Sequence, residues 1–334
     1  MIPKRIALIC GGPSPERGIS LNSARSVMDH LMDTMTIVPF YVDQQKHFYK
    51  LDPALLYSNT PSDFDFKLAH TTCKIPEQEL IKTLKTFDLV FPVIHGNFGE
   101  TGELQDFLES HHIPFVGCSA ETCRNMYYKD RAAAALKEIG FDTLPSITGD
   151  DDINAFFEKH KITRAIVKPI AGGSSIGVHS VTSVQQAIDI VSQSTVPMLI
   201  EPFCEGREFT IIVLQNPKKE PVALVPTEIQ ISYADGAIFD YRRKYLPTSN
   251  TMWACPPNFP DNVIQKIRTD AEAIFRLLNM RDFARLDGWV LDDGRILFTD
   301  MNPISGMEQN SFIFQQTSRI GMTHQEALCY VISR

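Results

Sequence analysis

The sequence KPIAGGSSIGV, residues 168–178, follows the β-rich run RAIVK, so Lys168 is predicted to lie at the end of a strand. Glycine adopts positive φ and lets the backbone approach a ligand closely. Successive backbone N–H groups in such a loop form a concave site for an anion, and the hydroxyls of Ser174 and Ser175 add donors. The spacing matches neither GxxxxGK[ST] nor GxGxxG, which excludes a Walker loop and a Rossmann fingerprint. The stretch is therefore either a phosphate clamp of another nucleotide-binding fold or a surface turn after an edge strand.

A second stretch, DFARLDGWVLDDGRILFTDMN at residues 282–302, is typical of a β-hairpin. Its central Asp-Gly dipeptide is a favoured two-residue turn, and counting outward from it pairs Asp287 with Asp300 and Arg285 with Asn302. Directly opposed residues share a face of a sheet, so these four side chains are predicted to lie together.

That grouping of charges indicates a metal site. Directly opposed carboxylates repel each other, and a bound divalent cation removes the repulsion. Oxygen ligands are those that Mg²⁺ prefers, commonly one or two carboxylates plus substrate phosphates. Arg285, beside the acids, could neutralise a phosphoryl group in transfer. The alternative is a solvated polar face on an edge hairpin.

Composition bounds the class of protein. The chain has 334 residues, 43% hydrophobic and 22% charged, as expected of a soluble globular protein with two or three domains. A net charge of -8 argues against nucleic-acid binding. The seven cysteines are odd in number and form no CxxC, which favours reduced thiols over disulfides or zinc. No apolar run is long enough to span a membrane, and no signal-peptide layout is present, so a cytoplasmic location is expected.

The first third of the chain alternates strands and helices. The strands RIALIC, TIVPFYV and DLVFPVI are separated by a helix with Ser20 as its N-cap and by the helix PEQELIKTLK. This order predicts a parallel sheet. Residues 45–75 show no clear period. The loop HGNFGETG follows a strand at its carboxyl end, where ligands of open α/β sheets collect, and IPFVG is predicted as a further short strand. A domain boundary is expected near Gly117 to Ala120.

The remaining segments are predicted as a small α/β unit and a β-rich unit. The β-rich unit holds REFTIIVL and PVALVPTEI, each expected as one strand, and a long amphipathic helix after Pro257. A polar passage from Ser232 to Pro257 separates them. A loop of that length inside a compact domain is usually functional.

The motifs taken together resemble a known family. Similarity to the ATP-grasp superfamily lies in KPIAGGSSIGV, MLIEPFCEGREFT, ARLDGW and FTDMNPISG. Similarity to the D-alanine–D-alanine ligase family within it lies in GGPSPERGISLNSA, HGNFGETGELQDFLESHHIPFVG and DYRRKYLP. The resemblance spans essentially the whole chain and implies an α/β, three-domain ATP-grasp fold. Its domains would be an N-terminal parallel-sheet substrate domain (1–120), a small central α/β domain (121–200) and a C-terminal, mainly antiparallel catalytic domain (201–334).

The resemblance also implies roles for individual residues. The nucleotide, held between the second and third domains, would contact Lys129, Lys168, Ser175, Glu201, Phe203, Glu208 and Lys244. Of these, Lys129, Lys168 and Ser175 would meet the phosphates, Glu201 and Phe203 the adenine, and Glu208 the ribose. Two Mg²⁺ ions, which Mn²⁺ could replace, would be held by Asp287, Asp300 and Asn302. Catalysis would use Glu16, Ser174, Tyr245, Arg285 and Gly306, with Arg285 and the Gly306 N–H at the phosphoryl group and the oxyanion. Substrates would meet Glu16 and His95 for the first amino acid and Ser311 for the carboxylate of the second.

The implied reaction is the joining of two D-alanines for peptidoglycan precursor synthesis, with ATP and D-alanine as the small-molecule partners. ATP would convert the first carboxylate to an acyl phosphate, which supplies a good leaving group and needs cations around the γ-phosphate. The acyl phosphate must be hidden from water, and the passage from Ser232 to Pro257, with Tyr241, Lys244 and Tyr245, suits a closing lid. The resemblance further implies a homodimer.

Two departures from the family pattern leave alternatives open. The bridging metal ligand of the family is normally glutamate, whereas Asp300 is one methylene shorter, which puts the second metal in doubt. Glu308 and Asn310 stand where the pocket for the second substrate is expected, after the altered run NPISG. The alternatives are an ATP-grasp ligase with another acceptor, such as D-lactate, D-serine or another amino acid, and a catalytically impaired nucleotide-binding relative.

Overall fold

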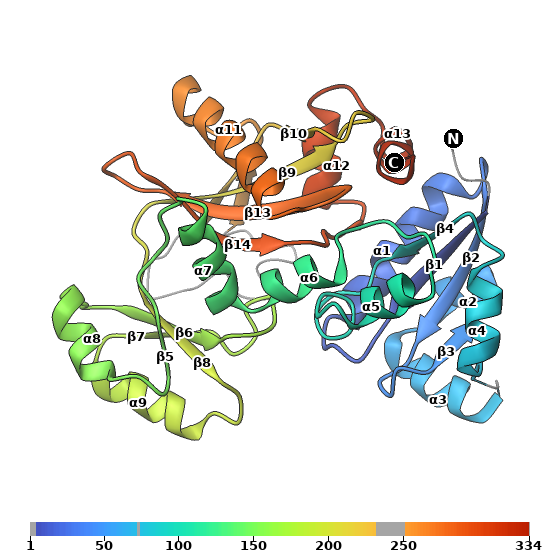
Figure 1. The fold of residues 1–334 in the computed structure, drawn as a ribbon, viewed down its shortest axis with the longest axis horizontal. Coiled ribbons are helices and arrows are strands. Elements are labelled where there is room, and N and C mark those ends of the chain that lie inside the picture. The colour runs from blue at the N-terminus through green and yellow to red at the C-terminus, as the bar shows by residue number, and fades with distance from the viewer. Residues whose placement is uncertain (1–4, 72–73, 232–250, 334) are drawn as a thin grey trace.

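The computed structural model describes residues 5–71, 74–231 and 251–333 and contains three β-sheets, each with its own helices (Figure 1). The N-terminal sheet lies on the right of the view, the small central sheet at the lower left, and the C-terminal sheet above and between them. The predicted α/β class with three sheets is therefore confirmed. The domain bounds at residues 120 and 200 stay a prediction.

The N-terminal sheet has the strand order β3-β2-β1-β4. Its strands are β1 (Arg5–Gly11), β2 (Thr36–Val42), β3 (Phe48–Lys50) and β4 (Leu89–Pro92). Its helices are α1 (Arg17–Leu31), α2 (Pro53–Ser58), α3 (Pro61–Thr71), α4 (Glu77–Leu84) and α5 (Glu103–Ser110). β1 pairs in parallel with β2 and β4, as predicted, while the edge strand β3 is antiparallel.

Two local predictions in this part were wrong, and a stretch for which no element was predicted contains a strand and helices. Residues 45–75, which show no period, contain β3 and two short helices. The helix α1 begins after Glu16 rather than after Ser20, and the Ser20 hydroxyl instead accepts a hydrogen bond from Gly11 N at 2.9 Å. The run IPFVG does not form a strand. It contributes only an isolated bridge, in which Phe115 pairs with Val90.

The central sheet is antiparallel, in the order β5-β8-β6-β7. Its elements are α6 (Ala120–Tyr127), α7 (Lys129–Glu138), β5 (Ile147–Thr148), α8 (Ile153–His160), β6 (Ala165–Pro169), β7 (His179–Val181), α9 (Val184–Gln193) and β8 (Met198–Pro202). The apolar sides of α8 and α9 pack on one face of the sheet in a small core of their own. The glycine-rich stretch joins β6 to β7, so Lys168 lies near the end of a strand, as predicted.

The C-terminal sheet is also antiparallel and runs β12-β11-β9-β13-β14, with β10 paired to β9. Its elements are β9 (Arg207–Gln215), β10 (Pro221–Ala223), β11 (Thr227–Ile231), β12 (Thr251–Ala254), α11 (Asp261–Leu277), β13 (Phe283–Val290), β14 (Ile296–Asn302), α12 (Phe312–Ser318) and α13 (His324–Ile332). PVALVPTEI, predicted as one strand, is split into β10 and β11. Pro226, which has no N–H to donate to a ladder, lies between them.

Two hydrophobic cores hold the C-terminal sheet between its neighbours. One core joins α1 of the N-terminal part to α12, α13 and one face of β9, including Ile212 and Phe314. The other lies between the opposite face of the sheet, α11 and the α6–α7 pair, around Phe209 and Phe298. The C-terminal sheet is thus packed against elements of both other parts, which fixes the surfaces that face each other. Among the helices of the described residues, none has the length and apolar run needed to cross a bilayer.

Candidate active site

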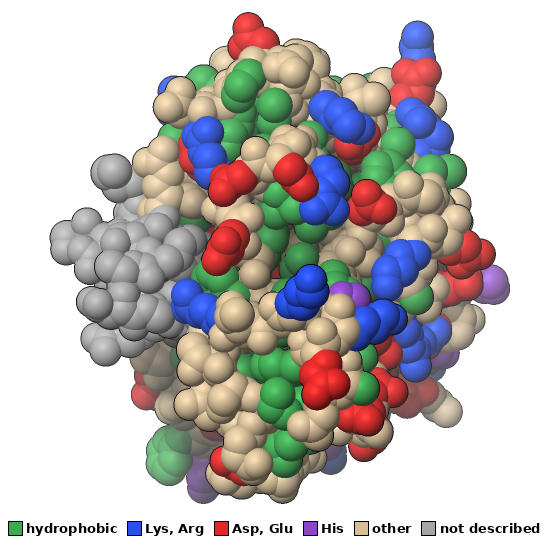
Figure 2. Space-filling view, turned by 90° about the vertical axis from the view of Figure 1, so that its left-hand side faces the viewer, with side chains coloured by type: hydrophobic (Ala, Val, Ile, Leu, Met, Phe, Trp, Pro, Cys, Tyr) green, Lys and Arg blue, Asp and Glu red, His purple; other side chains and the backbone are tan. Residues whose placement is uncertain are grey.

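A cavity of ≈ 1440 Å³ is lined by all three parts of the chain. The predicted site residues that the structure describes all line it: Glu16, His95, Lys129, Lys168, Ser174, Ser175, Glu201, Phe203, Glu208, Arg285, Asp287, Asp300, Asn302, Gly306 and Ser311. Tyr245 and Lys244, with Tyr241 and the lid prediction for residues 232–250, lie outside the described residues. On the face shown in Figure 2, the acidic and basic side chains of the described residues are interspersed rather than gathered by sign.

The hairpin β13–β14 supplies the floor of this cavity. Arg285 pairs with Asn302 and Asp287 with Asp300, as predicted from the sequence. The predicted two-residue turn is wrong, however, because Leu291 N donates to Arg295 O at 2.9 Å and the loop has three residues ending in Gly294 at φ 85. Three-residue hairpin loops end in this left-handed position.

The register survives because of a bulge. Beyond the turn Gly288 pairs with Phe298, so Thr299 is an extra residue of β14 that has no partner on β13. This extra residue cancels the shift introduced by the longer turn. As a result Asp300 and Asn302 are returned to the face that carries Arg285 and Asp287.

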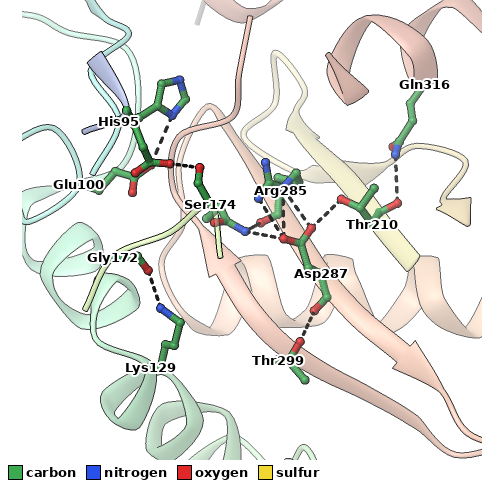
Figure 3. A network of polar contacts seen from close by, with 12 residues as sticks. His95, Glu100, Lys129, Gly172, Ser174, Thr210, Arg285, Asp287, Thr299 and Gln316 are labelled. Carbon is green, nitrogen blue, oxygen red and sulfur yellow. Dashed lines mark hydrogen bonds and ion pairs between the residues drawn. The ribbon is translucent and has the colours of Figure 1, made fainter. Parts of the chain in front are cut away.

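Asp287 is the centre of a network of hydrogen bonds on that face (Figure 3). Its carboxylate accepts from Arg285 Nε and Nη2, both at 3.0 Å, and from Asn302 Nδ2 at 3.0 Å. Thr210, on the adjacent strand β9 and 0% exposed, donates to Asp287 Oδ1 at 2.6 Å. The sequence analysis missed Thr210, and only its pairing opposite Asp287 in the folded sheet identifies it.

The donor set on this face fits a hard divalent cation. Asp287 and Asp300 oppose each other across the strand pair, and Asn302 adds an amide on the same side. Within the described ranges, no three His, Cys, Asp or Glu side chains converge on one point. Protein carboxylates alone therefore do not form a cage, and further oxygens would have to come from the amide and from phosphates, as is usual for Mg²⁺. Arg285 and Asn302 would have to yield Asp287 oxygens to an ion.

The glycine-rich loop faces this hairpin across the cavity. Gly172 and Gly177 have φ values of 105 and 74, and Ser174 and Ser175 have φ values of 54 and 56. Left-handed conformations at two successive serines are uncommon and cluster at ligand-binding loops. Lys129, at the start of α7, donates to Gly172 O (Figure 3), which ties the loop to the helix.

The two lysines of the cavity have different environments. Lys168 Nζ lies 2.5 Å from Glu201 Oε1 on the neighbouring strand β8. Burial lowers the pKa of Lys168, but the charges of Glu201 and Asp300 outweigh it and the pKa is raised overall. The pKa of Lys129 is lowered by burial, which Asp300 offsets only in part, with Lys168 adding to the decrease. Both lysines are therefore linked electrostatically to Asp300 across the cavity.

Beside the lysines, β8 leads into the segment that carries Phe203. The guanidinium of Arg164 covers one face of the Phe203 ring at 3.7 Å from its centroid, and Phe203 N donates to Arg164 O at 2.9 Å. Glu201 is held by Lys168. These contacts hold Glu201 and Phe203 in position where this segment lines the cavity.

This arrangement of loop, lysines and acidic hairpin can be compared with known proteins. The model of the D-ala D-ala ligase N-terminus matches residues 5–118, and that of the D-ala D-ala ligase C-terminus matches residues 146–333.

The chain belongs to the D-alanine–D-alanine ligase family.

Relatives of known sequence and structure are similar over nearly the whole length. The D-alanine--D-alanine ligase of Oceanobacillus iheyensis is 28% identical over 345 residues, covering 97% of this chain and 93% of that protein. The VanG D-Ala:D-Ser ligase from Enterococcus faecalis has a TM-score of 0.81 and 26% identity, covering 99% of this chain and 98% of that one. The D-alanine-D-alanine ligase from Coxiella burnetii, at 23% identity and a TM-score of 0.81, shares the fold. The fold is that of ATP-grasp ligases.

At the α1 end of the cavity, this D-alanine ligase-family enzyme gathers groups from distant parts of the chain. Glu16, 7% exposed, accepts a hydrogen bond from Ser174 of the glycine-rich loop. His95 Nδ1 lies 3.7 Å from Glu100 Oε1. A Cβ on Gly96 would lie 2.4 Å from Ser14 Oγ and 2.9 Å from Glu16 Oε2, so only glycine lets the His95 loop approach Glu16 this closely.

The loop of residues 303–311 closes the same end and is held at three points. It begins directly after β14 and ends at α12. At its middle, Met307 N donates to Ser23 Oγ of α1 at 3.0 Å. Beyond it, Gln316 of α12, 0% exposed, donates to Thr210 O at 3.0 Å and accepts from Ile212 N at 2.9 Å. Neither Ser23 nor Gln316 was identified from the sequence, because neither belongs to a local motif.

Proposed function

We propose that this enzyme joins two D-alanines in an ATP- and Mg²⁺-dependent reaction that passes through an acyl phosphate. The carrying observation is the placement of the acidic hairpin, with Arg285, opposite the glycine-rich loop and its two lysines in one cavity. This constellation supplies cations and backbone N–H groups for phosphates on one side and oxygen ligands for a metal on the other.

The residues of the cavity suit the phosphoryl transfer. A carboxylate does not condense with an amine in water, because the amine is protonated and hydroxide is a poor leaving group. We assign Lys129, Lys168 and the Ser175 loop to the phosphates of ATP. We assign Arg285 to the charge that develops on the transferring group, where fixed donors stabilise the transition state most. Mg²⁺, when bound by Asp287, Asp300 and Asn302, would screen the phosphate charges from one another.

The nucleotide base and ribose are assigned to the far end of the cavity. Glu201 and Phe203, with the backbone between them, would hold the adenine, and Glu208 would hold the ribose. The Lys168–Glu201 ion pair at 2.5 Å would lie at the boundary between the base and phosphate regions. Lys244 and Tyr245 keep their predicted roles as proposals that the described residues do not address.

The α1 end is assigned to the amino acids. Glu16 would bind the ammonium of the first D-alanine, and its hydrogen bond to Ser174 couples that ammonium site to the phosphate loop. His95 would lie beside the same substrate. The Gly306 N–H and Arg285 would donate hydrogen bonds to the tetrahedral oxyanion, and Ser311 would meet the carboxylate of the second amino acid. The product would be a precursor of peptidoglycan, and a cytoplasmic homodimer remains our proposal for its setting.

The assignment is tested by phosphate release with ATP, Mg²⁺ and D-alanine. Lys168→Ala and Asp287→Asn are each expected to lower kcat/KM at least ~100-fold, in line with the loss of one electrostatic transition-state contact. Lys137→Ala, an exposed lysine of α7, is the matched control and should leave the rate unchanged. Turnover that is undiminished in both site variants would refute the assignment. ATP binding without ADP formation for any amino acid would instead identify an impaired relative.

A second candidate function is a ligase with a different acceptor. It is favoured by the similarity to a D-Ala:D-Ser ligase and by Glu308 and Asn310 in the loop of residues 303–311. A panel of D-lactate, D-serine and other amino acids against fixed D-alanine decides between the two, since a clear preference for D-alanine removes this candidate. A titration of Mg²⁺ at saturating substrates shows whether Asp300 supports one ion or two.

A further inference from the structure

We propose that Glu308 selects a second amino acid whose side chain carries a hydrogen-bond donor, such as a hydroxyl or an ammonium group on Cβ. The inference rests on the ATP-dependent ligase activity proposed above, in the form that uses an acceptor other than D-alanine, and it names the chemical class of that acceptor. It is carried by the position of Glu308, by unpartnered polar atoms beside it and by the charge it adds to the pocket.

The position of Glu308 is fixed by its own loop. Ser311 N donates to Glu308 O at 2.8 Å, which closes a turn just before α12. The side chain folds back over Gly306, where a Cβ would lie 2.2 Å from Glu308 Oε2 and 3.0 Å from Oε1. The absence of a side chain at Gly306 therefore creates the space that this carboxylate fills, and the carboxylate lines the cavity beside the expected oxyanion site.

Three buried polar atoms in this end of the cavity have no hydrogen-bond partner within the described part of the chain. They are Glu308 Oε1, His95 Nε2 and Ser311 Oγ. Of the three residues, His95 is deeply buried, with 7% of its surface exposed. Buried polar groups are normally paired, so a cluster of unpaired ones indicates a ligand that brings both donors and acceptors. Figure 3 shows His95 turned with one ring nitrogen toward Glu100, which leaves the other for a different partner.

The negative charge of Glu308 limits which side chain that ligand can carry. Burial lowers the pKa of His95, but Glu100, Glu308 and Glu16 raise it more, so the carboxylate of Glu308 acts electrostatically on the centre of the pocket. An acceptor amino acid already brings its own carboxylate, which this added charge repels. A hydrogen-bond donor on the side chain of the second amino acid offsets this repulsion, because it pairs with the carboxylate of Glu308 in a strong hydrogen bond. A methyl side chain would leave Glu308 Oε1 unsatisfied.

The chain position of Glu308 assigns it to the second amino acid rather than to the first. The first is placed at Glu16 and Ser174, on the side of the glycine-rich loop. Glu308 lies between Gly306 and Ser311, on the side of α12, which is the approach left for a nucleophile once ATP and the first amino acid are bound. Discrimination through an unpaired polar group can be large, because a site built to hydrogen-bond a substrate group rejects the analogue that lacks it.

The test uses three acceptors of almost equal shape, which are D-serine, D-2,3-diaminopropionate and D-2-aminobutyrate. Each is offered to the full-length enzyme with D-alanine and ATP, and mixed dipeptides are measured by mass spectrometry alongside ADP formation. Wild type is expected to use D-serine, D-2,3-diaminopropionate or both at least ~10-fold better, in kcat/KM, than D-2-aminobutyrate. D-Serine isolates a hydroxyl donor and D-2,3-diaminopropionate isolates a cation.

Two variants make the outcome specific to Glu308. Glu308→Gln keeps the shape and should lose the preference for the ammonium side chain, whereas Glu308→Met should lose both donor preferences. Gln309→Ala, an exposed neighbour in the same loop, should keep the wild-type order. Equal use of D-2-aminobutyrate by wild type, or a donor preference that persists in Glu308→Met, overturns the inference. Absence of any dipeptide with any acceptor overturns the proposed ligase function instead, so the two failures are distinguishable.

Discussion

Replacing Thr210 by valine should weaken the metal site without disturbing the fold. The substitution keeps the shape of the side chain and removes the hydroxyl that donates to Asp287 Oδ1 at 2.6 Å. Hydrogen bonds to charged groups contribute about 1.5–3 kcal/mol, and each 1.36 kcal/mol is tenfold. Asp287 keeps its contacts with Arg285 and Asn302, so the lower part of that range applies and we expect a loss of about tenfold in kcat/KM.

The assay is ADP release over a range of Mg²⁺ concentrations, together with thermal unfolding. Thr210→Val should raise the Mg²⁺ concentration that gives half-maximal rate by at least several-fold, while the unfolding midpoint changes little. Thr227→Val is the matched control, since its hydroxyl is also 0% exposed but accepts from Gln316 and does not contact Asp287. An unchanged Mg²⁺ dependence in Thr210→Val, or an equal shift in Thr227→Val, would show that Thr210 does not position the carboxylate.

Two further predictions concern stability and thiol reactivity. Gly288→Ala places a Cβ 2.3 Å from Leu297 O and should lower the free energy of unfolding by about 3 kcal/mol in urea titration, whereas Gly294→Ala, with open space around it, should cost about 1 kcal/mol; equal losses would contradict the clash. Burial raises the pKa of Cys10 and of Cys204 to about 12, so alkylation by iodoacetamide at pH 8 should be about a thousandfold slower than in the unfolded chain. Because these thiols stay protonated in the folded chain, the stability they contribute is present below pH ~9 and is lost as the pH rises toward ~12, which equilibrium unfolding at pH 8 to 11 would measure.

The sequence predicted the elements that rest on local pattern. The apolar strands β1, β2, β6 and β9 were recognised because alternation or an apolar run is a property of the stretch itself. The strand and helices within residues 45–75 were not recognised, because such short elements have too few residues to show a period.

For the hairpin, the predicted strand pairing was correct, but the turn from which it was predicted was wrong. The pairing of Asp287 with Asp300 was expected from a two-residue turn, whereas the structure reaches it through a three-residue turn and a bulge at Thr299. Two errors of one residue cancel, and no single-sequence rule specifies the bulge.

Contacts between distant segments set the limit of the sequence analysis at the site. The ion pair of Lys168 with Glu201 joins strands 33 residues apart, and the hydrogen bond of Gln316 to Thr210 spans 106 residues. Both depend on how elements pack and not on a motif. The family resemblance, in contrast, grouped side chains that the fold does place around one cavity, although their roles remain proposals.

The anchoring of the 303–311 loop has a consequence for how new substrate preferences could arise. One end is continuous with the strand that bears Asp300, the other is clamped through Gln316 to the backbone of β9, and the middle is pinned to Ser23. Residues between these anchors, such as Glu308 and Asn310, can therefore be substituted while the residues assigned to the phosphates keep their positions. Replacement of this one short loop, in evolution or by design, could change the second substrate and leave the phosphorylation of the first unchanged.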